Sequence, residues 1–319
     1  MDDSVMGAAV RYEGFGPPDV LEVVSVPVRS PGPGEVLVRV RAAGVNPVDV
    51  AVLEVPLPFV PLKFPAIPGW DVAGEVVALG EGVESLAEDD GVFGLAGFPV
   101  PAGTFAEYAT VNAADLARRP DGLDWAEAGA LPLVGLTVLQ AFAAIGGLRS
   151  GQRVLVEAAA GGVGHVAVQV AKSSGCYVLG TASAPKHDFL RSLGVDEPID
   201  YSTGRNVYAD RPPVDVVLTS SGPEAAAEAV ASVAPGGAVV SIKGGITEEV
   251  AAVADGRGVR HANMLVHPDG AGLAELAGLV AAGRLRVHVS ESFALADVAA
   301  AYRAVASGHT TGKVVLLPS

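Results

Sequence analysis

The sequence has little of three things that narrow the class of the protein: cysteine, aromatic side chains and charge. A single cysteine, Cys176, excludes an internal disulfide and suits a reducing compartment such as the cytoplasm. Aromatic residues make up 5% of the 319 residues and charged residues 18%, whereas 50% of the chain is hydrophobic. This length and apolar content predict large buried cores shared between two domains.

Long hydrophobic runs and positive charge are also scarce. Glycine, proline or charge interrupts the apolar runs well short of membrane-spanning length, so no membrane segment is expected. Lysine and arginine total 21 against 36 aspartate and glutamate residues, a net charge of −15. Neither nucleic acid nor an anionic membrane is therefore expected as a partner. The first four residues lack the basic and apolar pattern of an export signal, which also predicts a cytoplasmic protein.

Glycine is abundant, with 40 residues, and one glycine-containing stretch is the most informative part of the chain. Residues 154–157 alternate like a short buried strand, residues 158–164 are small, and apolar residues at helical spacing follow from Val166. Strand, glycine turn and helix in this order are typical of a dinucleotide-binding site, where the helix N-terminus faces the pyrophosphate. The residues expected to contact the cofactor here are Gly161, Gly162, Val163 and Gly164.

The next strand, residues 176–181, indicates which dinucleotide is bound. An NAD-selective site usually has a carboxylate at the end of this strand, where it binds the ribose 2′-hydroxyl. This chain has Thr181, Ser183 and Lys186 instead, and an ammonium and hydroxyls suit a 2′-phosphate better. NADPH is therefore the expected cofactor. The alternative is that Lys186 only solvates the start of the following helix.

The two parts of the chain differ in their pattern. Up to about residue 120 the alternation of apolar and polar residues predicts strands separated by glycine- and proline-rich turns. From Asp124 the period becomes helical, and strands and helices then alternate, which predicts an α/β domain with a doubly wound parallel sheet.

Motifs along nearly the whole chain resemble one family, the zinc-independent medium-chain dehydrogenase/reductases of the quinone oxidoreductase and enoyl reductase branch. The resemblance rests on residues 44–49, 67–74, 103–108, 136–141, 180–186, 199–201 and 308–316 and on the glycine motif. It implies a GroES-like β-barrel catalytic domain, residues 1–122 and 266–319, with an inserted Rossmann NADP(H)-binding domain, residues 123–265. Substrate and nicotinamide would meet in the cleft between them. It also implies that Tyr201 and Ser221 bind the cofactor.

The resemblance also bears on metal chemistry. The positions that match zinc ligands of zinc-dependent relatives are Asn46, Trp70-Asp71 and Leu133, which lack the converging thiolate and imidazole donors that zinc needs. No metal is therefore expected. Asn46 and Thr137 are the candidate catalytic residues by family position. Asn46 could instead stabilise the turn at residues 44–47, and Thr137 could bond a carbonyl within its own helix.

These features predict an oxidoreductase that reduces a quinone or the C=C bond of an α,β-unsaturated carbonyl, because conjugation delocalises the charge without a metal. It could be a tailoring enzyme of a biosynthetic pathway. The apolar, proline-rich residues 53–65 could form a wall for a hydrophobic substrate or could simply pack on the barrel. Two alternatives are a reductive cyclase of a hydrophobic intermediate and a non-catalytic NADPH-binding sensor.

A homodimer is expected from the sheet of the second domain. Residues 239–242, or a neighbouring strand, should form an exposed edge, and relatives of this kind commonly join two such edges. The alternative is a monomer in which residues 247–259 cover that edge.

Overall fold

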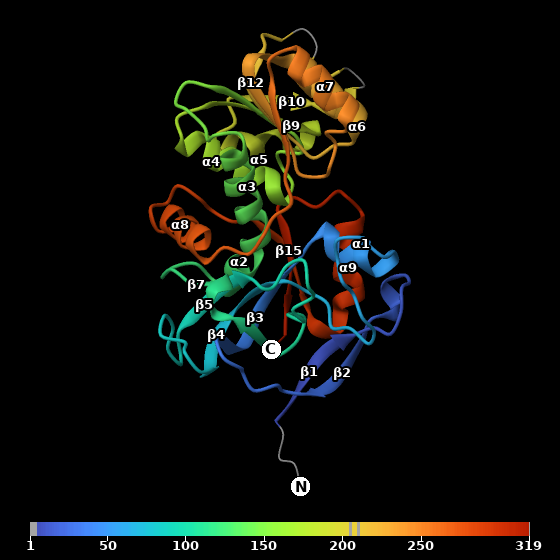
Figure 1. Ribbon diagram of the computed structural model, residues 1–319, viewed down its shortest axis with the longest axis vertical. Helices are drawn as coiled ribbons and strands as arrows, with labels where there is room; N and C mark the ends of the chain where they lie inside the picture. Colours follow the sequence, from blue (N-terminus) through green and yellow to red (C-terminus); the bar gives the residue numbers. More distant parts are fainter. Residues whose placement is uncertain (1–4, 204–205, 209–210, 319) are drawn as a thin grey trace. The chain divides into compact units, whose positions relative to one another are not determined.

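The computed structural model describes residues 5–203, 206–208 and 211–318, and the chain divides into two compact units. Unit 1 comprises Met1–Leu136, His267–Gly283 and Val287–Ser319, and unit 2 comprises Thr137–Val266 and Arg284–Arg286 (Figure 1). The first four residues, on which the expectation about export rests, lie outside the described part of the chain. Within the described part, no helix is both long and apolar enough to cross a membrane.

Unit 1 is built on a sheet in the order β14-β15-β3-β4-β5-β7, with β6 also paired to β3 and with a separate β1-β2 pair. Along β3 the side chains of Val36, Val38 and Val40 are fully buried, as the alternation in the sequence predicts. β15, near the end of the chain, pairs antiparallel with the end of β3. Both ends of the chain therefore contribute to one core.

The strands of unit 1 are β1 (Met6–Arg11), β2 (Glu22–Pro27), β3 (Glu35–Val45), β4 (Asp71–Leu79), β5 (Gly91–Leu95), β6 (Tyr108–Asn112), β7 (Leu116–Arg118), β14 (Val289–Ala294) and β15 (Lys313–Leu317). Its helices are α1 (Pro47–Glu54), α2 (Trp125–Ala130), α8 (Gly270–Ala281) and α9 (Val298–Ala306), with short 3-10 turns η1 (Pro18–Val20), η2 (Ala113–Asp115) and η5 (Leu295–Asp297). α3 (Pro132–Ala144) runs from unit 1 into unit 2.

Unit 2 has a parallel sheet in the order β10-β9-β8-β11-β12-β13, which confirms the predicted doubly wound α/β fold. Its strands are β8 (Arg153–Val156), β9 (Tyr177–Ala182), β10 (Glu197–Asp200), β11 (Val214–Thr219), β12 (Val233–Ser241) and β13 (Arg260–Asn263). Its helices are α4 (Gly162–Ser173), α5 (His187–Ser192), α6 (Pro223–Ser232) and α7 (Glu248–Gly256), with η3 (Ala184–Lys186) and η4 (Tyr201–Thr203).

The strand order of unit 2 defines its ligand-binding edge. From β8 the chain adds β9 and β10 on one side and then crosses over to add β11, β12 and β13 on the other. In sheets of this kind the crevice lies beyond the carboxyl ends of the strands, where the order reverses. That point lies between β8 and β11, directly beside the glycine turn that precedes α4.

The first boundary of the units differs from the expected division after residue 122. That division would place α2 in the Rossmann domain, whereas α2 packs on β3 and β4 of unit 1. The approach is close, because a Cβ atom on Gly129 would lie 2.8 Å from the backbone carbon of Ala42. The change of period at Asp124 identifies a helix correctly, but it carries no information about which core the helix covers.

Of the two positions expected for the edge strand, the neighbouring strand is the correct one, and residues 239–242 are not. Residues 239–241 belong to β12, which pairs with β11 on one side and with β13 on the other. Val239 and Val240 are fully buried. The outer position of the sheet belongs to the neighbouring strand β13, which is short and partly polar.

Candidate functional site

The glycine turn of unit 2 has the backbone geometry of an anion-binding helix start. Gly161 is the N-cap residue of α4 in an extended conformation, and it has no side chain that could cap the first N–H groups of the helix. Those N–H groups and the positive end of the helix dipole favour a phosphate. A Cβ atom on Gly164 would lie 2.2 Å from the carbonyl oxygen of Ala158, so only glycine permits this close packing. The residues therefore fit the pyrophosphate of a dinucleotide.

Ala158 and Thr181 hold the turn in place. Ala158 has a φ of +47°, in the left-handed region that is unfavourable for a residue with a Cβ atom. Its N–H donates to the Thr181 hydroxyl at 3.0 Å, and the Ala159 N–H donates to the Thr181 carbonyl at 2.9 Å. Thr181 is buried. The structure thus gives this predicted cofactor contact a role in shaping the loop.

Three other residues predicted to bind the cofactor, Ser183, Lys186 and Tyr201, follow two adjacent strands of the sheet. β9 and β10 are parallel, with Ala182 opposite Asp200, so Ser183 and Tyr201 leave the sheet side by side. Ser183 is the N-cap of η3, Lys186 ends it, and Tyr201 is 54% exposed. Burial lowers the pKa of Lys186. The structure therefore brings these three side chains to one end of the sheet, beside the glycine turn.

A polar cluster at the crevice contains the predicted cofactor contact Ser221, but its central residue, Glu157, was not predicted from the sequence. Glu157 directly follows β8 and is 8% exposed. Its Oε2 atom accepts hydrogen bonds from the Thr219 hydroxyl at 2.7 Å, the Ser220 N–H at 3.1 Å and the Ser221 hydroxyl at 2.6 Å. Its Oε1 atom accepts one from the Tyr208 hydroxyl, and burial and this carboxylate raise the pKa of Tyr208. The sequence did contain one signal for this cluster, namely a glutamate directly after a buried strand.

In unit 1 the positions that match zinc ligands converge on an ammonium group. The Nζ atom of Lys313, 3% exposed, donates to the Asn46 side-chain oxygen and lies 3.3 Å from Oδ2 of Asp71. Asp71 also accepts bonds from the Asn46 amide at 2.8 Å and from the Leu133 N–H at 2.7 Å. Trp70 is turned away and donates its indole N–H to the Val100 carbonyl. One carboxylate, one amide and an ammonium do not fit a zinc ion.

The candidate catalytic residues are both buried. Asn46 is fully buried, and its amide group donates to Asp71 and, at 3.3 Å, to the Gly44 carbonyl. This arrangement favours the alternative in which Asn46 stabilises its own turn over a role as a donor to substrate. Thr137 lies on α3 and is 5% exposed.

A second buried carboxylate, Asp49, adjoins this cluster. Its Oδ2 atom accepts the Asn46 N–H at 2.8 Å, while Oδ1 is buried and has no hydrogen-bond partner. Burial raises the pKa of Asp49 to about 8, and the nearby charge of Asp71 adds to the effect. Two carboxylates face one ammonium, so one carboxylate stays protonated at neutral pH. Asp49 is that group, because Asp71 has more donors and lies next to Lys313.

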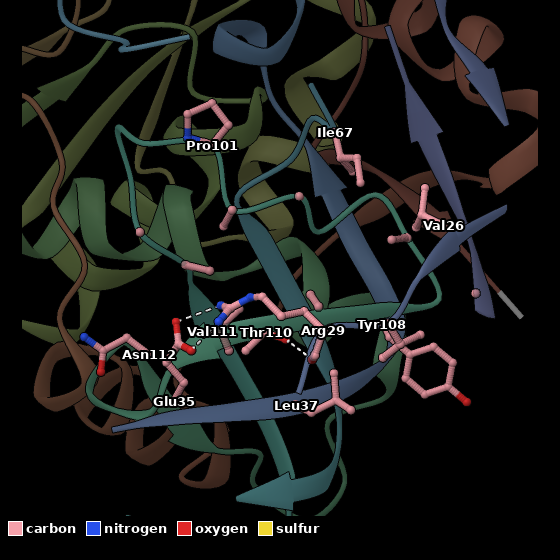
Figure 2. Close-up of a pocket in the computed structure, with 18 of the residues that line it drawn as sticks. Val26, Arg29, Glu35, Leu37, Ile67, Pro101, Tyr108, Thr110, Val111 and Asn112 are labelled. Atoms are coloured by element: carbon pink, nitrogen blue, oxygen red, sulfur yellow. Dashed lines mark hydrogen bonds and ion pairs between the residues drawn. The ribbon is translucent and has the colours of Figure 1, made fainter. Parts of the chain in front are cut away.

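A separate cavity of about 490 Å³ lies on the surface of unit 1, between β2, β6 and residues 96–103 (Figure 2). None of the described residues that line it is a predicted site residue. The cavity is lined by Arg29, whose guanidinium donates two hydrogen bonds to Glu35 at 2.7 and 2.8 Å. The backbone carbonyl of Arg29 accepts a hydrogen bond from the Thr110 hydroxyl. The Arg29 guanidinium is therefore already neutralised and does not mark an anion-binding site.

The protonated state of Asp49 makes stability depend on pH. The folded-state pKa of about 8 lies above the ordinary value near 3.8, so the folded chain binds the proton more tightly. Stability is then lost as pH rises through this window. We expect Asp49→Asn to remove that loss. The free energy of unfolding of the variant, relative to the unchanged chain, should therefore rise by about 4 kcal/mol between about pH 5 and about pH 9.

Urea unfolding at several pH values measures this effect, with the exposed Asp121→Asn as the matched control. A difference between the Asp49 variant and the unchanged chain that stays flat across the range would contradict the assignment.

Comparisons with known proteins agree with the two folds described above. The family models for the alcohol dehydrogenase GroES-like domain and for zinc-binding dehydrogenase match residues 32–121 and 193–316. The chain is 34% identical to quinone oxidoreductase QR1 of Triphysaria versicolor, over 97% of this chain and 98% of that protein. It is 33% identical to an NADPH-dependent alkenal/one oxidoreductase of Arabidopsis thaliana, over 96% of this chain and 78% of that protein.

A solved structure agrees as well. The quinone oxidoreductase of Coxiella burnetii superimposes with a TM-score of 0.88 at 32% identity, over 99% of this chain and 100% of that one. The chain therefore belongs to the quinone oxidoreductase and enoyl reductase branch of the medium-chain dehydrogenase/reductase superfamily, with a GroES-like and a Rossmann domain, and is an oxidoreductase of a family that binds a nicotinamide cofactor.

Proposed function

We propose that this protein is an NADPH-dependent reductase of hydrophobic quinones or of the C=C bond of α,β-unsaturated carbonyl compounds. The observation that carries the proposal is the ammonium of Lys313 at the positions that match a metal site, bonded to Asn46 and beside Asp71. No step of the reaction is therefore assigned to a metal. The names of the relatives, which include a quinone and an alkenal/one oxidoreductase, support the same substrate class.

The reaction follows from the charge that it must stabilise. A bound nicotinamide would supply a hydride, which a conjugated C=C–C=O system can accept at its β-carbon while the electron pair moves to the carbonyl oxygen. A proton from water would then add to the α-carbon of the enolate. Conjugation spreads the negative charge, so the protein needs to orient the substrate and exclude water more than to polarise a carbonyl.

The substrate is proposed to be flat and apolar because of the aromatic residues in and around residues 53–65. Phe59 is 41% exposed and its ring lies 6.5 Å from that of Phe98, while Phe64 packs edge-on against Phe15 at 5.0 Å. Val60 of the same segment is buried. The segment thus packs on the barrel through some residues and leaves aromatic faces exposed through others, which suits a conjugated ligand.

The proposal also includes a cytoplasmic location. Cys176 is a free and buried thiol, and burial raises its pKa, which keeps it unreactive. A reducing compartment agrees with this cysteine usage.

Consumption of NADPH with a substrate panel tests the proposed activity. We expect turnover with a quinone or a 2-alkenal and little with the saturated aldehyde of the same length, because only the conjugated compounds delocalise the charge. Reduction of the saturated aldehyde at a comparable rate, or no turnover with any conjugated compound, would overturn the proposal.

The preference for NADPH over NADH is proposed from Ser183 and Lys186, which stand where a carboxylate would select NAD. If the ammonium pairs with the 2′-phosphate, Lys186→Ala should lose roughly 1–3 kcal/mol of the preference, the range of a charge-assisted bond. Dissociation constants for both cofactors measure it, and Lys243→Ala is the control outside this group. Equal affinities of the unchanged protein for NADPH and NADH would reject the assignment.

The protein is further proposed to form a homodimer through the outer strand of unit 2. β13 pairs only with β12 among the described strands, so its other edge is available for pairing. Light scattering at micromolar concentration should give twice the single-chain mass of 32.0 kDa. A mass equal to that of one chain would instead favour a monomer.

A further inference from the structure

Glu157 lies at the point where the sheet of unit 2 opens to a ligand. It directly follows β8, and its N–H donates to the Leu218 carbonyl of β11 at 3.0 Å. β8 and β11 are the neighbouring strands at which the strand order reverses. A carboxylate at this point is unexpected for a site that binds a dinucleotide, because the pyrophosphate of the cofactor is also negatively charged.

The hydrogen bonds of this carboxylate determine the direction of three hydroxyl groups. An ionised carboxylate only accepts hydrogen bonds. The hydroxyls of Thr219, Ser221 and Tyr208 each lie within hydrogen-bond distance of it, so each must donate its proton to Glu157. Their oxygen lone pairs are then left as acceptors. Thr219 already accepts the Ser221 N–H at 3.2 Å.

Ser221 is the member of this cluster that lies at the crevice and is not fully buried. Thr219 is fully buried, whereas Ser221 and Tyr208 are half-buried, and of these two Ser221 lies in the segment that directly follows β11. With its proton given to Glu157, the Ser221 oxygen offers lone pairs to its surroundings. A phosphate has no donor at neutral pH to use them, but ribose hydroxyls and a carboxamide NH₂ group do.

We propose that Glu157 is a positioning residue that makes Ser221 an acceptor for the nicotinamide riboside half of the cofactor. The inference rests on the proposed function, and it assigns the two ends of the crevice opposite polarities. The N-terminus of α4 presents N–H donors to the pyrophosphate, while the cluster at β11 presents acceptors to the riboside and repels phosphate. The arrangement fixes the direction in which the cofactor lies.

Glu157→Leu tests this role because leucine has a similar size and accepts no hydrogen bond, whereas a glutamine would keep its carbonyl oxygen on the Ser220 N–H and so keep the acceptor of the Ser221 hydroxyl. Without the carboxylate, the Ser221 hydroxyl has no fixed direction and can turn its proton toward the riboside. We expect NADPH to bind about tenfold more weakly, the effect of a lost hydrogen bond together with a misdirected donor. Adenosine 2′,5′-bisphosphate lacks the riboside and should bind within about twofold of the unchanged protein.

Titration calorimetry gives both affinities, with Glu224→Leu, at an exposed position, as the matched control. Ser221→Ala should weaken NADPH similarly, and the double variant should lose no more than either single one, because both changes remove the same contact. Equal weakening of NADPH and the bisphosphate would mean that Glu157 only supports the neighbouring glycine turn, and would overturn the inference. Unchanged NADPH affinity of Glu157→Leu would do the same.

The test separates the inference from the choice of cofactor. If the unchanged protein binds NADH in preference to NADPH, the 2′-phosphate assignment fails, and the comparison is made between NADH and ADP. The expected loss for the riboside-containing ligand is the same. If the unchanged protein binds neither dinucleotide, the proposed function and this inference both fail.

Discussion

The fold of unit 1 depends on one buried ammonium group. Removing the charge of Lys313 from water is costly, and the cost is offset only by well-placed acceptors. These are the Asn46 oxygen at the end of β3, the Asp71 carboxylate at the start of β4 and, at 3.4 Å, the carbonyl of Val45. Asp71 in turn accepts the Leu133 N–H at the beginning of α3. Lys313, at the start of β15, thus connects this strand directly to the end of β3 and the start of β4, and through Asp71 to the first turn of α3.

The buried ammonium group of Lys313 also leaves no room for a metal ion among these side chains of the barrel. Asp71, Asn46 and Lys313 neutralise and satisfy one another, so a second cation has no complete set of donors there. The additional carboxylate of Asp49 has no cation of its own and keeps its proton instead. A site of this composition suits reactions in which conjugation within the substrate carries the developing charge.

The sequence predicted the features that depend on local pattern. The order of strands and helices in unit 2 and the glycine turn before α4 follow from periodicity, because each strand or helix shows its buried face in its own residues. Features that depend on distant neighbours were not predicted. The position of α2 on the barrel, the interior place of residues 239–241 and the loop-shaping role of Thr181 are set by tertiary contacts. Glu157 was missed because its partners lie about sixty residues away, at the end of β11.

The ammonium group of Lys313 lies at the positions that match the catalytic metal site of zinc-dependent relatives. Elemental analysis of the purified protein, combined with turnover before and after prolonged chelation, tests whether the protein works without a metal. We expect zinc well below one equivalent per chain and the same rate of NADPH-dependent reduction after chelation. Stoichiometric zinc, whose removal abolishes turnover and whose return restores it, would show instead that the reaction depends on a metal.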